Sequence, residues 1–242
     1  MKIILQGSNG KLGSEISKIC HEKQIAINKV TRNILSSQKN FEEFMNSIEK
    51  PHIYLDVSLP DGTSQLCDHL SSIDKKNLSK IHALIIGTTG HNENCLQKIE
   101  KVSRGIPVCV VSNFSKGIYL FDEILNAKTS QNIKVADLMK KLGFSIGLLE
   151  VHHEQKKDAP SGTAKTLNQS LGLEENKIAS WRIGQVFGEH EVRAVNEDES
   201  LTIKHIAQHR KIFAEGALDL ARNIYQSDVR PGFLKRQDYM IL

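Results

Sequence analysis

Short apolar runs alternate with segments of helical spacing along the first half of the chain. The apolar runs lie at residues 2–6, 25–30, 52–57, 82–86 and 107–111. Apolar side chains spaced three and four positions apart follow in the segment through Ile16 and Ile19 and at residues 41–49, 62–70 and 94–104. Strands that are nearly continuously apolar and alternate with helices are typical of parallel sheets covered on both faces. The pattern therefore predicts an α/β fold with a doubly wound parallel, Rossmann-like sheet.

The second half of the chain has a different order of elements. Helical spacing occupies residues 118–130 and 135–142, and residues 144–152 predict a strand. Residues 191–196 and 200–205 predict paired strands around a turn, and residues 216–224 predict a helix that returns to the first domain. We therefore expect a nucleotide domain formed by residues 1–114 and 217–242. Residues 115–216 are expected to form a smaller α+β domain with a mixed sheet for substrate binding and oligomerisation.

Composition excludes several classes of protein. The net charge of +4 is mild, aromatic residues are 5% of the 242 residues, and Lys and Arg do not cluster, so we expect no nucleic-acid partner. No apolar run is long enough to cross a membrane or to form a signal peptide. Four widely spaced cysteines without a CxxC pair predict neither a disulfide framework nor a zinc site, and they favour a reduced, cytoplasmic protein.

The first apolar run ends in the glycine turn Gly7-Ser8-Asn9-Gly10-Lys11-Leu12-Gly13, directly before a predicted helix. A strand, a glycine turn and a helix form the arrangement in which such a motif binds the phosphates of a dinucleotide. A purely structural turn remains the alternative, because glycine also serves tight connections that bind nothing.

The second apolar run ends at Val30-Thr31-Arg32 without an acidic residue. In many NAD-binding proteins a carboxylate at this point accepts a hydrogen bond from the ribose 2′-hydroxyl group. Arg32 offers instead a planar guanidinium group that suits a 2′-phosphate. We therefore expect NADPH to be used at least as well as NADH, unless Arg32 is only a solvated loop residue.

Residues 150–164 read Glu-Val-His-His-Glu-Gln-Lys-Lys-Asp-Ala-Pro-Ser-Gly-Thr-Ala. Two histidines, a residue type that can donate a proton near neutral pH, and Lys156 stand just before a helix that Ser161 can cap. The free N–H groups at the start of that helix, from Ser161 to Thr163, would bind a carboxylate. Each feature alone is commoner as a structural one, but together they predict a site that holds an acidic small molecule and gives it a proton.

This string resembles, nearly position for position, the signature of the 4-hydroxy-tetrahydrodipicolinate reductase (dihydrodipicolinate reductase) family. The resemblance runs nearly end to end, since motifs of the family match at residues 56–60, 87–90, 113–117, 182–192, 205–217 and 231–233. It implies reduction of the cyclic imine dicarboxylate 4-hydroxy-tetrahydrodipicolinate by NADPH or NADH in diaminopimelate and lysine biosynthesis. It also implies a homotetramer. We expect no metal site.

The resemblance assigns roles to individual residues. His152 would be the general acid, with Lys156 sharing that role. The substrate would be bound by His153, Lys156, Ser161, Gly162 and Thr163. The cofactor would be bound by Gly7, Ser8, Asn9, Gly10, Lys11, Leu12, Gly13, Arg32, Ser58, Gly87, Thr88, Thr89, Ser112, Asn113 and Phe114. Core packing remains the alternative for Phe114, and His190 and His205 are expected to be structural.

Two other classes of function remain open. One is a different two-domain nicotinamide oxidoreductase, similar to aspartate dehydrogenase. The other is a dinucleotide sensor that has kept the fold without catalysis. The intact His-His-x-x-Lys string disfavours both, and reduced-cofactor consumption that depends on the imine dicarboxylate would separate all three.

Overall fold

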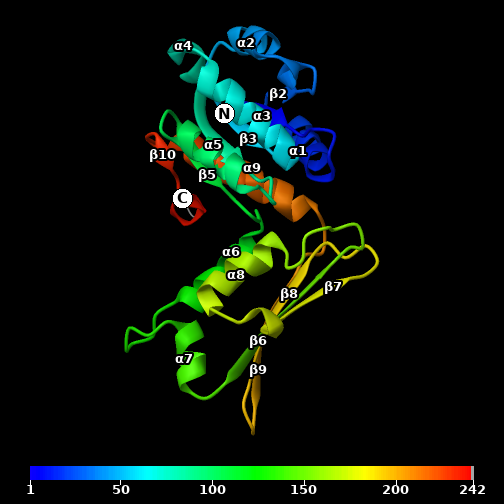
Figure 1. Cartoon of the computed structure of the whole chain (residues 1–242), viewed down its shortest axis with the longest axis vertical. Coiled ribbons are helices and arrows are strands. Elements are labelled where there is room, and N and C mark those ends of the chain that lie inside the picture. The colour runs from blue at the N-terminus through cyan, green and yellow to red at the C-terminus, as the bar shows by residue number, and fades with distance from the viewer. Residues whose placement is uncertain (241–242) are drawn as a thin grey trace. The chain divides into compact units, whose positions relative to one another are not determined.

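The computed structural model describes residues 1–240, which form two compact units (Figure 1). The first unit contains Met1–Phe114 and the chain from Phe213 onward, and the second is Ser115–Ile212. The chain re-enters the first unit inside helix α9 (Lys211–Gln226), at Phe213 rather than at residue 217. No helix of the described residues combines the length and apolarity needed to cross a membrane.

The first unit is built on a six-stranded sheet of order β10-β5-β4-β3-β1-β2, in which every pairing is parallel. The strands are β1 (Ile3–Gln6), β2 (Ile27–Val30), β3 (His52–Asp56), β4 (Ile81–Ile86), β5 (Pro107–Val110) and β10 (Gly232–Phe233). The expected parallel Rossmann-like sheet is confirmed. Strand β10 was not predicted, because two residues are too few to carry a recognisable pattern.

Helices cover both faces of this sheet, because successive side chains of a strand point to opposite faces. Ile4, Tyr54 and Leu84 belong to the core cluster that includes residues of α2, α3 and α5. Ile3 and Leu5 belong to the cluster that includes residues of α1 and α9. The helices of this unit are α1 (Lys11–Glu22), α2 (Gln38–Asn46), α3 (Pro60–Ser72), α4 (Lys75–Leu78), α5 (Glu93–Ser103) and α9, with 3₁₀ turns η1 (Ile34–Ser36) and η3 (Arg236–Tyr239).

A buried polar network joins the carboxyl ends of β1 and β3. The hydroxyl group of Tyr54 donates to Gln6 Oε1 (2.8 Å), and Gln6 Nε2 donates to Ser58 Oγ (3.0 Å). Ser58 Oγ in turn donates to Asp56 Oδ1 (2.6 Å), and Thr63 donates to the other carboxylate oxygen. Burial raises the pKa of Asp56, while the hydrogen bonds from Ser58 and Thr63 act in the opposite direction. The network fixes the loop that follows β3.

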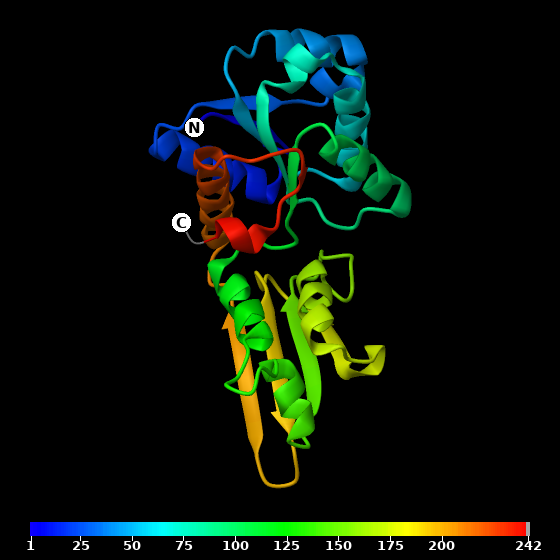
Figure 2. The same ribbon diagram turned by 90° about the vertical axis from the view of Figure 1, so that its left-hand side faces the viewer.

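The second unit has a four-stranded mixed sheet of order β7-β6-β8-β9. Strands β6 (Ser145–His152) and β7 (Ile178–Arg182) are parallel, whereas β8 (Glu189–Val195) is antiparallel to β6 and to β9 (Ser200–Ile206). Helices α6 (Lys116–Asn126), α7 (Val135–Lys141) and α8 (Gly162–Leu171) pack on one face through the third core cluster (Figure 2), and η2 (Glu175–Lys177) precedes β7. The mixed sheet is confirmed.

The opposite face of this sheet leaves large apolar side chains exposed. Trp181 of β7 is 56% exposed, Val195 of β8 is 41% exposed and Ile206 of β9 is 44% exposed. The strand register places these residues on the face away from Leu148 and Val192, which pack against the helices.

One predicted helix is too long. The helix expected over residues 118–130 ends at Asn126, because Ala127 is extended and Lys128 forms an antiparallel bridge with Lys134. The turn between them is closed by a backbone hydrogen bond from Asn132 to Thr129, with Asn132 at a φ of +59°. Asparagine tolerates this left-handed conformation better than most residues, so the chain turns where helical spacing alone would continue.

Replacement of Tyr54 by Phe should lower the free energy of unfolding by about 1–3 kcal/mol, because Gln6 Oε1 would lose its donor inside the core. Urea unfolding followed by circular dichroism measures the change. Tyr225→Phe is the matched control, since the described residues provide no hydrogen-bond partner for that hydroxyl group. Equal stability of Tyr54→Phe and wild type would show that the network does not hold the sheet.

Candidate active site

The residues assigned to the cofactor all follow the carboxyl ends of strands in the first sheet. Register pairs Gln6 with Val30 and Asp56, Asp56 with Ile86, and Ile86 with Val110. The strands therefore end together, and the loops after them lie at one edge. The turn of residues 7–13 follows β1, Arg32 follows β2, Ser58 follows β3, residues 87–89 follow β4 and residues 112–114 follow β5. In open parallel sheets, ligands bind at this edge.

The glycine turn is as tight as a phosphate cradle requires. Gly7 has a φ of +83°, and a Cβ atom there would lie 2.6 Å from the carbonyl oxygen of Val57. A Cβ atom on Gly13 would overlap the carbonyl oxygen of Gly7. Gly10 caps α1 without any side-chain hydrogen bond, and the first turn of α1 carries no acidic residue. The turn thus keeps its backbone close and the helix start open to an anion, which fits a dinucleotide pyrophosphate.

The remaining cofactor candidates differ in their surroundings. The hydroxyl group of Thr88 is buried and has no hydrogen-bond partner among the described residues. The side chain of Arg32 is exposed. Ser58 already donates a hydrogen bond to Asp56. Phe114 is a core residue, and its ring lies so close to Gly87 that a Cβ atom on Gly87 would overlap it. Thr88 and Arg32 are thus available to a ligand, while Ser58 and Phe114 shape the edge around it.

In the second unit, the strand register brings several polar side chains onto the face that the helices cover. Glu150 and His152 are two positions apart on β6 and therefore point the same way. Glu150 lies opposite His190 of β8, and His152 lies opposite Arg182 of β7. His190 in turn lies opposite His205 of β9. One end of an otherwise apolar face thus carries a row of titratable groups.

Glu150 is the centre of this row. Its side chain is fully buried, and one oxygen, Oε2, contacts His152 Nδ1. The other oxygen, Oε1, accepts from Arg182 Nη2 (2.7 Å) and from the backbone N–H of Ser161 (3.3 Å). Burial raises the pKa of Glu150, but hydrogen bonds from His152, Arg182 and Ser180 outweigh it and lower the pKa to about 2. The carboxylate is therefore ionised at neutral pH.

Arg182 also holds the backbone of the loop that follows β6. Its Nη2 donates to the carbonyl oxygen of Asp158 (2.5 Å), and its Nε donates to that of Lys156 (3.2 Å). The same guanidinium group thus fixes Glu150 and the loop that carries Lys156.

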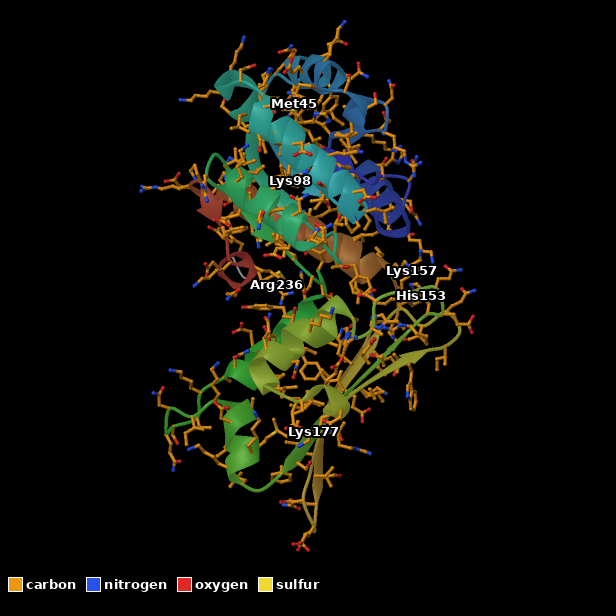
Figure 3. The ribbon with its side chains drawn as sticks, in the orientation of Figure 1. Met45, Lys98, His153, Lys157, Lys177 and Arg236 are labelled. Carbon is orange, nitrogen blue, oxygen red and sulfur yellow. The ribbon has the colours of Figure 1, made fainter. Side chains whose placement is uncertain are left out.

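The loop itself contains an ion pair. Lys156 Nζ lies 2.8 Å from Asp158 Oδ1, and both side chains are partly exposed. Burial raises the pKa of Asp158, yet the nearby Lys156 ammonium group and a backbone hydrogen bond from Gly162 lower it overall. Lys157 is exposed and His153 is half-buried; both belong to this loop, as Figure 3 shows.

The start of α8 is only partly as expected. Ser161 caps the helix by accepting a hydrogen bond from the backbone N–H of Ala164 (3.1 Å), as predicted. Its own N–H, expected to be free for a ligand, is donated to Glu150 instead. That expectation is wrong because Glu150 lies on the neighbouring strand, which the linear string does not reveal. Gly162 is partly exposed and Thr163 is buried at the same helix start.

His190 packs against His152, with ring centroids 5.2 Å apart. Its Nε2 lies 3.3 Å from Ser161 Oγ, and Nδ1 has no hydrogen-bond partner among the described residues. Burial, and then the charge of His152, lower the pKa of His190 to about 3, so this ring is neutral. His205 Nε2 lies 3.1 Å from Ser115 Oγ, the cap of α6.

Glu150, His152 and His190 each offer one possible metal-ligand atom, and these atoms lie within 4.8 Å of one another. Both oxygens of Glu150 are already engaged, one of them by the positive charge of Arg182. A cation here would have to displace these contacts and sit beside a guanidinium group. The set therefore suits a hydrogen-bonded proton donor better than a metal centre.

Sequence reasoning missed Glu150 and Arg182 as parts of this cluster and gave His190 no role in it. The spacing of Glu150 and His152 on a predicted strand was the available signal, because residues two apart share a face. Arg182 could not be placed, since β7 was not predicted.

Comparison with known proteins gives one consistent result. Residues 1–114 match the family described as dihydrodipicolinate reductase, N-terminus, and residues 125–240 match dihydrodipicolinate reductase, C-terminus. A 4-hydroxy-tetrahydrodipicolinate reductase of Campylobacter jejuni subsp. jejuni serotype O:6 is 30% identical over 247 residues, covering 91% of this chain and 92% of that protein. One from Rickettsia bellii is 30% identical over 257 residues, covering 99% and 94%.

A solved structure has the same fold over nearly its whole length. Dipicolinate-bound dihydrodipicolinate reductase from Paenisporosarcina sp. TG-14 superimposes with a TM-score of 0.65 at 19% identity, covering 97% of each chain. Both parts of the family are thus present in order, and relatives match over nine-tenths of their length. The chain belongs to the dihydrodipicolinate reductase family.

Proposed function

We propose that this chain reduces 4-hydroxy-tetrahydrodipicolinate to tetrahydrodipicolinate in diaminopimelate and lysine biosynthesis. The observation that carries the proposal is the cluster of His152, Glu150 and Arg182 next to the loop of Lys156. A dicarboxylate substrate that needs a proton requires an ionisable donor and a cation held nearby, and this cluster supplies both.

His152 is proposed as the general acid. Its Nδ1 contacts Glu150, so Nε2 is the nitrogen left to face a substrate. Gly188 leaves room there, since a Cβ atom at that position would lie 3.1 Å from His152 Nε2. When bound, the reduced nicotinamide supplies the hydride, and the residues of this chain supply the proton, the orientation and the charge.

Lys156 and the start of α8 are proposed to bind one substrate carboxylate, with His153 helping to hold the ring. In the described structure Lys156 pairs with Asp158, whose carboxylate also accepts from the Gly162 backbone. Asp158 thus holds the same donors that a substrate carboxylate would take. Binding would then exchange one carboxylate for another, with little change in charge around Lys156.

The residues at the carboxyl edge of the first sheet are proposed to hold NADPH or NADH, with a preference for NADPH. Binding of a dinucleotide is supported by the open start of α1 and the close turn of Gly7 and Gly13. It is also supported by the Thr88 hydroxyl group, which has no hydrogen-bond partner among residues 1–240. The preference rests on Arg32, an exposed cation directly after β2.

A homotetramer located in the cytoplasm is proposed as well. The large apolar side chains exposed on the open face of the second sheet support association, because exposed apolar surface often marks a site of contact with another protein. The four cysteines are buried free thiols, which fits a reducing compartment.

The experiment that tests the reaction is a steady-state assay with purified protein and both reduced cofactors. Oxidation of NADPH or NADH should require the imine dicarboxylate and should not occur with oxaloacetate and ammonia, the substrates of an aspartate dehydrogenase running in reverse. Cofactor binding without turnover of the imine would favour a dinucleotide sensor instead.

His152→Gln should lower kcat by roughly 10²–10⁴-fold, the usual contribution of a positioned proton donor. Cofactor affinity should stay within about twofold, because the assigned cofactor residues belong to the other unit. Stopped-flow turnover and fluorescence titration of the cofactor measure the two effects. His209→Gln, an exposed histidine of the same unit, is the control. Turnover of His152→Gln at the wild-type rate would remove the acid role.

Pyridine-2,6-dicarboxylate, a planar analogue, should inhibit competitively against the substrate. Lys156→Ala should raise its inhibition constant by about tenfold or more, because a charge-assisted contact is lost. Asp158→Asn should lower the constant, since the competing carboxylate is gone. Lys157→Ala, at the exposed neighbouring position, should change nothing. Unchanged inhibition in Lys156→Ala would contradict the carboxylate contact.

Arg32→Ala should reduce kcat/KM with NADPH by about tenfold and leave kcat/KM with NADH nearly unchanged, because only NADPH carries the 2′-phosphate. Steady-state kinetics with each cofactor gives the ratio. Lys29→Ala removes a nearby exposed cation on β2 and should preserve the NADPH/NADH ratio. The assignment fails if both variants keep that ratio.

A further inference from the structure

Glu150 occupies an unusual position for a side chain with no assigned role. It is fully buried, it stands on the same strand and face as His152, and its two carboxylate oxygens contact different partners. Oε2 contacts His152 Nδ1, and Oε1 accepts hydrogen bonds from Arg182 Nη2 and from the backbone N–H of Ser161. We infer that Glu150, held by Arg182, is the positioning residue of His152: it fixes the proton on Nδ1 and leaves Nε2 to deliver the proton to substrate. The inference rests on the acid role of His152 proposed above.

The charge of Glu150 supports this assignment. A carboxylate with a pKa of about 2 is ionised and can only accept hydrogen bonds, so the nitrogen that faces it must carry the proton. An ionised carboxylate also stabilises the imidazolium form, which is the form that gives a proton away. The same features show that Glu150 is not itself the acid, because it has no proton to give near neutral pH.

Arg182 makes the buried carboxylate possible. A carboxylate without partners in an apolar core would be neutralised or would destabilise the fold. A guanidinium group is a permanent cation in proteins. That of Arg182 is anchored on three backbone carbonyl oxygens, those of Lys156, Asp158 and Trp181. Because two of these carbonyls belong to the loop after β6, the orientation of His152 and the position of Lys156 depend on one guanidinium group.

The other groups around His152 do not replace Glu150. His190 of β8 packs on the ring, but its lowered pKa leaves it neutral, and its Nε2 faces Ser161. Lys156 and Asp158 of the loop form their own ion pair, and His205 of β9 contacts Ser115. Among the described residues, Glu150 is the carboxylate that contacts the His152 ring. The arrangement follows the general rule that a catalytic imidazole is oriented by an acceptor on its second nitrogen.

Glu150→Gln tests the inference, because an amide keeps the shape and loses the charge. The value of kcat should fall on the order of 10²-fold or more, while KM for the substrate and the affinity for pyridine-2,6-dicarboxylate stay within about threefold. The decline of kcat with rising pH should begin at lower pH, since the imidazolium has lost its stabilising carboxylate. Glu191→Gln, which removes a carboxylate from the opposite face of the same sheet, should keep wild-type kcat and pH profile.

The double variant Glu150→Gln/His152→Gln separates positioning from general damage. If Glu150 acts through His152, the double variant should be no slower than His152→Gln alone. Ser180→Ala removes a weaker hydrogen bond to Glu150 and should shift the pH profile of kcat in the same direction by a smaller amount. This variant replaces Glu150→Gln as the test if the Gln variant does not fold. The inference would be overturned if the losses in kcat of the two single variants multiplied in the double variant. It would also be overturned if the pH profile of kcat in Glu150→Gln or in Ser180→Ala equalled that of the wild type.

One readout does not depend on turnover. In Glu150→Gln, and by less in Ser180→Ala, the imidazolium form of the His152 ring followed by NMR should be lost at lower pH than in the wild type, because the neighbouring negative charge is removed or weakened. Loss of that form at the same pH as in the wild type would overturn the inference, whereas a wild-type protein that fails to reduce the imine would overturn only the proposed reaction.

Discussion

The second unit depends on keeping a buried carboxylate ionised. Glu150 is fully buried, and its charge is stabilised by Arg182, His152 and the N–H at the start of α8. These partners come from β7, from β6 itself and from the loop before α8, so satisfying one charge brings three separate segments together. Removing one partner of such a group typically costs several kcal/mol, because the remaining charge stays buried. The requirement to pair Glu150 therefore also fixes the geometry in which His152 and Lys156 are presented.

The first unit obeys a different constraint, which is close approach of the backbone. At the carboxyl edge of the sheet, Gly7 and Gly13 leave no space for a side chain, and the start of α1 is left without an acidic side chain or a capping hydrogen bond. Behind this edge, the network from Tyr54 to Asp56 satisfies buried polar groups that would otherwise destabilise the strand ends. At this edge of the sheet, the buried hydrogen bonds satisfy the polar groups behind the strand ends, and the glycines keep the turn after β1 free of side chains.

The sequence predicted most of the fold, for identifiable reasons. Strands β1, β3, β4 and β5 of the parallel sheet are nearly continuous apolar runs, and the strands of the 189–206 hairpin flank a polar turn, so both patterns are local. Strand β7 and the end of α6 were not predicted correctly. Alternation in β7 is hidden because its outer face carries Trp181, and α6 ends at a turn that depends on the bridge between Lys128 and Lys134. The spacing of apolar residues along the chain does not show which backbone segments pair with each other.

The candidate site was predicted less completely than the fold. The signature string made His152 and Lys156 candidates, because the chemistry of these residue types is visible in the sequence, and their roles stay predictions. The contacts of Glu150 with Arg182 and with the N–H of Ser161 join positions 32 and 11 residues apart, so they arise only when β6, β7 and α8 come together.

The tautomer of His152 tests this account most directly. Nitrogen-15 NMR of the wild-type protein reports which ring nitrogen carries the proton when the pH is high enough for the ring to be neutral. The signals of His152 are assigned by comparison with His152→Gln. The account predicts that Nδ1 stays protonated and that Nε2 gains and loses the proton. A neutral ring protonated on Nε2, with Nδ1 bare toward Glu150, would contradict it.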